Sequence, residues 1–243
     1  MNADGTLYGA EALLRWNHPV GGMLYPPLVI ALAEEAGLTD DLGDYVIDRA
    51  CRTLEAFYAR YDTSLCLSVN ITADQLRNPL FAQAVETILR RYSFPREALG
   101  LELTEQTALF GSPQMTKSLR QLHETGTHIL LDDFGMGHSS LSYLQNSPFD
   151  VVKLDGSLVG DVDRNERSRE ILSTILYLSR QLHFHVIAEY VETTEQREAL
   201  RKLGCVCYQG YLYSPAVPFE SFCAFAEEYG IQKRETDAAD EHM

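Results

Sequence analysis

Short apolar runs of strand type alternate with amphipathic helical segments along most of the chain. The apolar runs predict seven strands, at residues 7–16, 64–71, 99–105, 128–133, 149–155, 183–192 and 206–212. The segments with helical periodicity and end signals are residues 26–36, 40–60, a stretch up to 92, 113–124, 140–145, 166–182, 195–203 and 219–229. Strands that alternate with helices predict an α/β fold whose parallel sheet has right-handed crossovers.

The length of 243 residues suits a TIM-like (β/α)8 barrel, which typically has ~250 residues, although the pattern provides only seven strands. No linker-like stretch interrupts the alternation, so one domain over residues 1–230 is expected. The polar tail at residues 231–243 is expected to be disordered.

The charge balance narrows the classes of partner. With 35 acidic and 20 basic residues the formal net charge is −15, the wrong sign for a nucleic-acid polymer. No apolar run approaches the roughly 20 residues that span a bilayer, so direct membrane insertion is not expected. Five cysteines without metal-type spacing fit a reducing compartment. We therefore expect a cytoplasmic domain, whose parent protein is either soluble or tethered to a membrane.

Nearly every predicted strand carries an ionisable or amide residue close to its carboxyl end. In chain order these residues are Glu11, Asn70, Glu102, Asp132 with Asp133, Lys153, Glu189 and Gln209. In a barrel of this class the carboxyl ends of the strands converge on one mouth, where active sites lie. Acidic residues scattered over a surface would not recur at this one place in each strand.

The adjacent pair Asp132 and Asp133 gives this mouth its chemistry. Neighbouring side chains of a strand point to opposite faces, so both can serve one site only where the strand ends and its backbone turns. Two carboxylates held together would force one to take up a proton unless a cation lies between them. Oxygen ligands favour Mg²⁺ or Mn²⁺, and the pair could bridge two ions roughly 3.5–4 Å apart. Lys153 is expected to stay charged among so many carboxylates.

Seven ordered motifs give the chain a family resemblance. They are Glu11-Ala-Leu-Leu-Arg15-Trp16, Val69-Asn70-Ile71, Glu102-Leu-Thr-Glu105, Asp132-Asp133-Phe-Gly135, Lys153-Leu-Asp155, Ala188-Glu189-Tyr-Val-Glu192 and Gln209-Gly-Tyr211. Together they resemble the EAL-domain cyclic-di-GMP phosphodiesterases over almost the whole chain. The resemblance implies hydrolysis of cyclic di-GMP to linear pGpG by a water activated between two Mg²⁺ or Mn²⁺ ions.

The resemblance also implies a role for each matching residue. The first metal would be bound by Glu11, Asn70, Glu102 and Asp132, and the second by Asp132, Asp133 and Glu189. Lys153 would position the attacking water, so that the catalytic set is Lys153, Glu189, Asp133 and Glu11. The substrate would be contacted by Arg15, Leu13, Gln209 and Asp155, with Arg15 on a phosphate. Glu105, Gly135 and Gly137 would anchor the loop after Asp133, and Glu192 would support the site.

The sequence departs from the family pattern at three places. In the loop after Asp133 the family usually has a small residue and an aromatic where this chain has Met136 and His138. Tyr190 stands where the family usually has glycine, and in a regular strand it would point away from the mouth if Glu189 points into it. The family's first strand, which ends in a Tyr-Gln-Pro type motif, is not matched, as if the domain were N-terminally truncated. A barrel lacking that strand would have two unpaired edges.

Two other functions compete with hydrolysis. Met136, His138 and the unmatched strand suggest a non-catalytic cyclic-di-GMP receptor, although no metal ligand is missing. On physical grounds alone, a metal and Lys153 could instead support proton abstraction next to a carboxylate. By analogy with the family, the partner is cyclic di-GMP, the domain forms a homodimer, and it is joined to sensor or other signalling domains. The pair His183 and His185 lies too far along its strand from Glu189 to share the site.

Overall fold

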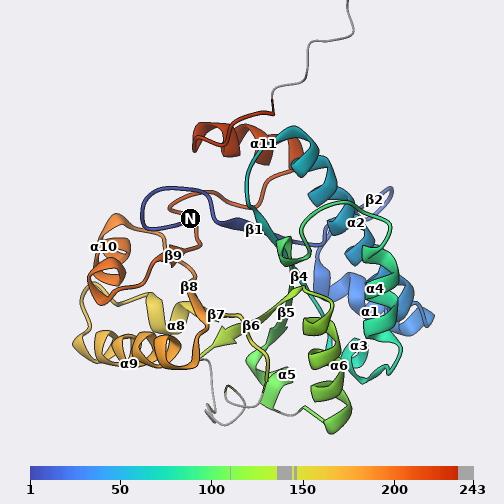
Figure 1. The fold of residues 1–243 in the computed structure, drawn as a ribbon, viewed down its shortest axis with the longest axis horizontal. Helices are drawn as coiled ribbons and strands as arrows, with labels where there is room; N and C mark the ends of the chain where they lie inside the picture. Colours follow the sequence, from blue (N-terminus) through green and yellow to red (C-terminus); the bar gives the residue numbers. More distant parts are fainter. Residues whose placement is uncertain (110, 136–143, 145–146, 235–243) are drawn as a thin grey trace, which may run out of the picture.

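The computed structural model describes residues 1–234 except residues 110, 136–143 and 145–146. Its centre is a curled parallel sheet with helices around its outer face, the TIM-like arrangement that the sequence predicts (Figure 1). Neighbours in the sheet follow chain order: β1 (Gly9–Ala12), β4 (Cys66–Asn70), β5 (Leu99–Thr104), β6 (His128–Phe134), β7 (Val151–Leu154), β8 (His185–Ala188) and β9 (Cys207–Tyr208).

Of the helices that the structure describes, the short ones at residues 105–109 and 156–159 and the 3₁₀ turn at 96–98 were not predicted, and the others match the predicted segments. The described helices are α1 (Pro26–Ala36), α2 (Thr39–Arg60), α3 (Ala73–Arg77), α4 (Phe81–Leu89), α5 (Glu105–Leu109), α6 (Pro113–Glu124), α8 (Gly156–Val159), α9 (Glu166–Leu182), α10 (Thr194–Leu203), α11 (Phe219–Glu228) and the 3₁₀ turn η1 (Arg96–Ala98). The helical stretch expected up to residue 92 is split into α3 and α4, and the helix expected at 140–145 lies mostly outside the described residues. Among the helices that the structure describes, none has the length and apolar character needed to span a bilayer.

Local signals explain where these helices begin and end. Thr193 caps α10 in a capping box, since its hydroxyl accepts from the Gln196 N–H and the Gln196 side chain accepts from the Thr193 N–H. Gly37 and Gly204 end α1 and α10 with φ of 69° and 90°, the left-handed conformation that glycine adopts without a steric penalty.

The barrel interior has an apolar layer below its polar mouth. Leu130, Val151, Ile187 and Cys207 are buried together on four neighbouring strands, and Tyr8 packs against them. Outward-facing residues of the sheet, such as Leu101 of β5 and Val152 of β7, are buried beneath the helices. Inward-pointing side chains two residues further along each strand therefore lie above this apolar layer, towards the carboxyl ends.

The prediction of one strand over residues 7–16 is wrong for the second half of that range. Only Gly9–Ala12 joins the barrel sheet, while Trp16–His18 (β2) pairs antiparallel with Gly22–Leu24 (β3) in a separate hairpin. The turn is closed by His18, whose Nδ1 accepts from the backbone N–H of Gly21 at 2.9 Å. No turn residue lies between Ala12 and Trp16, so the sequence does not reveal that the chain leaves the barrel after Ala12.

The expectation of two unpaired sheet edges also needs correction. On the β9 side, the N-terminal residues bond antiparallel to the strand, with Tyr208 N donating to Met1 O and Ala3 N to Val206 O, both at 2.8 Å. Between β9 and β1 the closing contact is made by side chains, since Gln209 Nε2 donates to Glu11 Oε2 at 3.0 Å. Within the described residues the sheet does not pair β1 with β9.

The polar tail predicted from residue 231 begins with residues that touch the domain. Residues 231–234 run beside the end of α2, where Arg234 N donates to Arg60 O at 2.9 Å and Lys233 forms a bridge with Tyr61. Residues 235–243 lie outside the described residues, so disorder there stays a prediction.

Candidate active site

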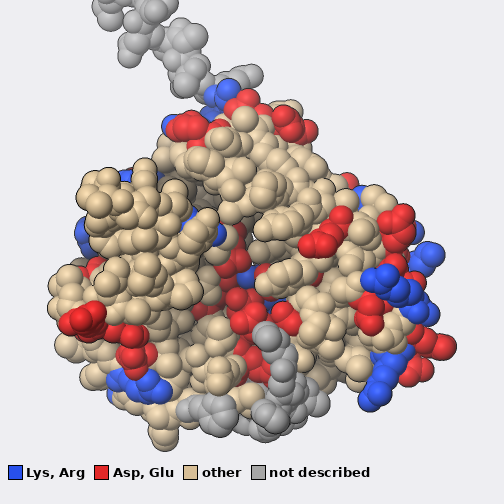
Figure 2. All heavy atoms as spheres, turned by 180° about the vertical axis from the view of Figure 1, so that it is seen from behind, with Lys and Arg blue, Asp and Glu red and all other residues tan. Residues whose placement is uncertain are grey.

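Five carboxylates from four strands meet at the mouth of the barrel. We call them the acidic cluster: Glu11, Glu102, Asp132, Asp133 and Glu189. Each lies in the carboxyl-terminal half of its strand or just beyond it, so the parallel sheet brings together residues far apart in sequence. Figure 2 shows acidic atoms gathered in the centre of this face, where the surface is hollowed.

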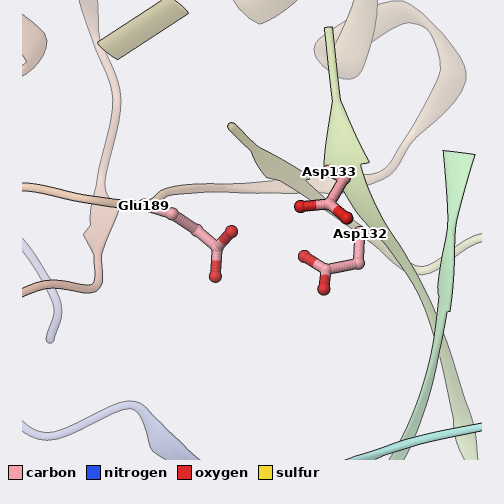
Figure 3. Close-up of side chains that lie close together, drawn as sticks. All are labelled: Asp132, Asp133 and Glu189. Atoms are coloured by element: carbon pink, nitrogen blue, oxygen red, sulfur yellow. The ribbon is translucent and has the colours of Figure 1, made fainter. Parts of the chain in front are cut away.

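A β-bulge allows Asp132 and Asp133 to face the same site. Between Leu131 and Phe134 the register of β6 against β7 shifts, so that β6 has one residue more than its partner. Asp133 adopts a φ of 56°, which turns its side chain out of the strand alternation. Both carboxylates point toward Glu189 (Figure 3), and ligand atoms of the three residues lie within 4.8 Å of one another. The predicted turn at this pair is confirmed.

Lys153 lies at the centre of the acidic cluster with only 1% of its side chain exposed. Its Nζ is 2.9 Å from Glu189 Oε1, 3.1 Å from both Glu11 Oε2 and Glu102 Oε2, and 3.4 Å from Asp132 Oδ1. One cation thus faces four carboxylates. The described cluster keeps an excess of negative charge at the bottom of the mouth.

This imbalance appears in the pKa values. Burial raises the pKa of Glu102 to about 7 and that of Glu189 to about 8, since desolvation outweighs the attraction of Lys153. Burial and the neighbouring Asp132 also raise the pKa of Asp133. For Glu11 burial acts in the same direction, but Lys153 and hydrogen bonds outweigh it and lower the pKa. Burial opposes the charge of Lys153, yet the carboxylates around it raise its pKa well above the usual value.

The donor set of the acidic cluster fits a divalent cation. Glu102 Oε1 and Asp132 Oδ1 are buried and have no hydrogen-bond partner among the described residues, and Asp132 Oδ1 approaches Lys153 without hydrogen-bond geometry. Buried carboxylate oxygens without partners are costly unless a cation or water satisfies them. Asn70 adds an amide beside Glu11, to which its Nδ2 donates at 2.9 Å. Carboxylate and amide oxygens are the ligands that Mg²⁺ and Mn²⁺ prefer.

The raised pKa values give this cation site a predicted pH dependence. From about pH 5 to pH 8 the folded protein holds protons on Glu102 and Glu189 that the unfolded chain has released, so without metal its stability falls as pH rises. A divalent cation replaces those protons, so it binds more tightly at higher pH. In thermal unfolding, Mn²⁺ should raise Tm more at pH 8 than at pH 5.5. An equal rise at both pH values would contradict the prediction.

The predicted phosphate ligand Arg15 lies on the outer part of the mouth. It is exposed and follows β1, and its Nη1 donates to Leu14 O at 2.8 Å. Its guanidinium carbon lies 5.1 Å from the ring centroid of Tyr25, a cation–π contact from the segment after the β2–β3 hairpin. Leu13 is 41% exposed beside it. Tyr25 was missed in the sequence, which has no signal that the hairpin folds back on Arg15.

The remaining predicted residues are placed by backbone contacts around the mouth. Glu105 Oε2 accepts from Gly135 N at 2.9 Å, so the segment after Asp133 is held to the start of α5 as expected. Asp155 is 8% exposed and caps α8, where its Oδ1 accepts from the backbone of Ser157 at 2.8 Å. Gly137 lies outside the described residues, as do Met136 and His138.

For Glu192, His183 and His185 the structure gives contacts or positions outside the acidic cluster. Glu192 is exposed after β8, and its N–H donates to Gln196 Oε1 at 2.8 Å. His183 ends α9 and His185 begins β8, both exposed at the opposite end of that strand from Glu189. The interpretation that these histidines do not take part in the site is confirmed.

Tyr190 does not follow the expected alternation. In a regular strand, residues two apart donate to the same neighbour, but Glu189 N donates to Leu154 O of β7 and Val191 N to Gln209 O beyond β9. Tyr190 has a φ of 54° between them, and its ring packs on Gly156. Burial raises the pKa of its hydroxyl, with further contributions from carboxylates of the acidic cluster. The expected alternation of Glu189 and Tyr190 assumed a regular strand, and that condition is not met because β8 ends at Ala188.

Comparisons with known proteins identify relatives of this fold and site. Residues 1–216 match the family model described as the EAL domain. Cyclic di-GMP phosphodiesterase NbdA of Pseudomonas aeruginosa is 37% identical over 227 residues, which cover 93% of this chain and 29% of that protein. The bifunctional diguanylate cyclase/cyclic di-GMP phosphodiesterase MucR of the same organism is 36% identical over 91% of this chain and 32% of its own length. The chain thus spans about a third or less of these curated relatives.

Solved structures extend the similarity to three dimensions. The P. aeruginosa MucR phosphodiesterase, solved as a complex with c-di-GMP, superposes with a TM-score of 0.80 and 35% identity, over 89% of this chain and 90% of that one. The EAL enzyme Bd1971 in its form bound to cAMP and cyclic-di-GMP has a TM-score of 0.83 and 28% identity, over 93% of this chain and 62% of that one.

Proposed function

Because the chain belongs to the EAL domain family of cyclic di-GMP phosphodiesterases, we propose that it hydrolyses cyclic di-GMP to linear pGpG. The observation that carries the proposal is the complete acidic cluster at the barrel mouth, with Lys153 among its carboxylates and two buried oxygens left for a cation. The names of the relatives indicate cyclic di-GMP as the substrate, and the carboxylate and amide oxygens at the mouth support metal-dependent hydrolysis.

Two divalent cations, Mg²⁺ or Mn²⁺, would supply Lewis acidity and lower the pKa of the attacking water. Asn70 with Glu11, Glu102 and Asp132 would hold one of them, and Asp132 would share the other with Asp133 and Glu189. Asp132 lies between the two sets because the bulge in β6 presents both aspartates to the mouth.

The other residues at the mouth would bind and orient the dinucleotide. Lys153 stays protonated and fixed by its carboxylates, so it acts as a positioned cation that orients the water and balances charge at the phosphate. Arg15 is exposed at the rim and would bind a phosphate oxygen, with Tyr25 holding its guanidinium. Gln209 orients Glu11 through its hydrogen bond and would lie beside the substrate with Leu13 and Asp155.

A non-catalytic cyclic-di-GMP receptor is the alternative. Of the features that favoured it, Met136 and His138 lie outside the described residues. The described acidic cluster retains every carboxylate expected of an enzyme, and such a concentration of buried charge would be costly for a receptor that binds no metal. The homodimer and the attached signalling domains stay predictions.

The direct test is turnover of the proposed substrate. The protein should release pGpG from cyclic di-GMP in Mg²⁺ or Mn²⁺, and the product would be measured by chromatography. Glu11→Ala removes the carboxylate that contacts Asn70, Lys153 and Gln209, so it should abolish product formation. Failure of folded, metal-loaded protein to form product, while it binds cyclic di-GMP, would select the receptor.

A further inference from the structure

Tyr190 is a residue beside the acidic cluster to which the metal and phosphate chemistry gives no role. It directly follows Glu189, a member of the acidic cluster, yet 56% of its surface is exposed. An exposed aromatic ring immediately beside buried carboxylates is not explained by core packing.

The backbone at Tyr190 is held in a conformation that a side chain disfavours. A φ of 54° in a residue other than glycine is strained, and for a bulky residue it is an outlier. The hydrogen bonds of Glu189 N to Leu154 O at 3.1 Å and of Val191 N to Gln209 O at 3.0 Å fix this conformation from both sides. Backbone strain that surrounding structure maintains beside an active site is the kind of outlier from which a functional role is inferred.

The ring has a supported side and an exposed side. A Cβ added to Gly156 would lie 2.9 Å from Tyr190 Cγ and 3.0 Å from Cδ2, so the ring rests directly on the glycine backbone. Gly156 is itself fixed, since it begins α8 directly after the buried cap residue Asp155. Because the ring is supported by rigid backbone and remains more than half exposed, it forms a preorganised stacking surface.

We propose that Tyr190 stacks against one purine base of the cyclic dinucleotide and so positions its phosphodiester over the acidic cluster. This inference rests on the proposed function. A phosphodiester held at Asp132, Asp133 and Glu189 has its nearest base one sugar away, and Tyr190 is one residue from Glu189. Stacking on an aromatic ring requires only the face of the base, so Tyr190 contributes affinity rather than discrimination between purines.

Replacing Tyr190 by glycine tests this role without disturbing the fold. Tyr190→Gly should weaken cyclic di-GMP binding and raise KM roughly 5- to 150-fold, the range for loss of one base stack, with kcat changed much less. Tm should not fall, because glycine adopts the left-handed conformation without strain. Mn²⁺ affinity should be unchanged, since the metal ligands are retained. The separate variant Tyr190→Phe should have a KM within about twofold of the wild-type value, because the ring face is kept.

Controls separate this inference from the proposed function. Tyr177→Ala removes a similarly exposed tyrosine from α9 and should leave KM unchanged. A Tyr190→Gly enzyme with wild-type KM and Kd overturns the inference alone, as does a Tyr190→Phe enzyme as defective as Tyr190→Gly, which would assign the effect to the hydroxyl. Wild-type protein that binds but does not hydrolyse cyclic di-GMP overturns the proposed hydrolysis, and calorimetric Kd values of the variants then decide the role of Tyr190. Wild-type protein that does neither overturns both.

Discussion

Asp133→Asn is expected to lower kcat by roughly 10²–10³-fold, because Lewis-acid stabilisation by a metal ion is worth several kcal/mol and each 1.36 kcal/mol corresponds to tenfold in rate. The substitution keeps the size of the side chain. Asparagine also tolerates the left-handed backbone that Asp133 adopts at φ 56°, so the bulge in β6 should persist. What is lost is one carboxylate of the group it forms with Asp132 and Glu189.

The same substitution should leave the stability of the metal-free protein intact. Without Asp133, metal-free protein should be no less stable than wild type, since burial and Asp132 already raise the pKa of this carboxyl and removing it relieves repulsion. Activity should be measured as pGpG release and stability by thermal unfolding. Asp163→Asn is the matched control, because this exposed aspartate undergoes the same charge change and its carboxylate lies 3.9 Å from Arg164 Nε. Unaltered turnover by Asp133→Asn would refute the assignment of Asp133 to the metal site.

The barrel and its acidic mouth could be predicted because both depend on patterns local in sequence. Each strand is a short apolar run, and each site residue lies in or just after its carboxyl-terminal half, as Glu102 does in β5 and Lys153 in β7. Parallel pairing then brings these ends together without further information. The turn at Asp132–Asp133 was also predictable, since two adjacent carboxylates can share a site only if the alternation breaks.

The features that could not be predicted depend on backbone departures and contacts distant in sequence. Tyr190 was expected to alternate with Glu189, but a positive φ at a tyrosine cannot be read from an apolar pattern. Tyr25 packs on Arg15 because a hairpin leaves the barrel after Ala12, and no turn residue between Ala12 and Trp16 signals this departure. The pairing of Met1 and Ala3 with the β9 segment covers one edge of the sheet, and nothing in either segment signals the other.

Lys153→Met should both inactivate the protein and destabilise its metal-free form. Methionine matches the length of lysine but leaves four carboxylates around a site with 1% exposure and no cation. Removing one partner from a buried charge network typically costs about 3–5 kcal/mol, which corresponds to a fall in Tm of roughly 6–20 °C for a domain of this size. The loss should be smaller at pH 5.5 than at pH 8, because protons on Glu102 and Glu189 relieve the repulsion below their raised pKa values.

Divalent metal should restore the stability of Lys153→Met but not its activity. Mn²⁺ can neutralise the carboxylates, whereas it cannot replace a positioned ammonium that orients the water. Tm at both pH values, with and without Mn²⁺, and pGpG release measure the two effects separately. Lys233→Met is the matched control, since Lys233 pairs with Glu227 at 3.0 Å on the surface with 66% of its side chain exposed and should change neither quantity appreciably. If Lys153→Met were as stable as wild type without metal at pH 8, Lys153 would not be what keeps these carboxylates together.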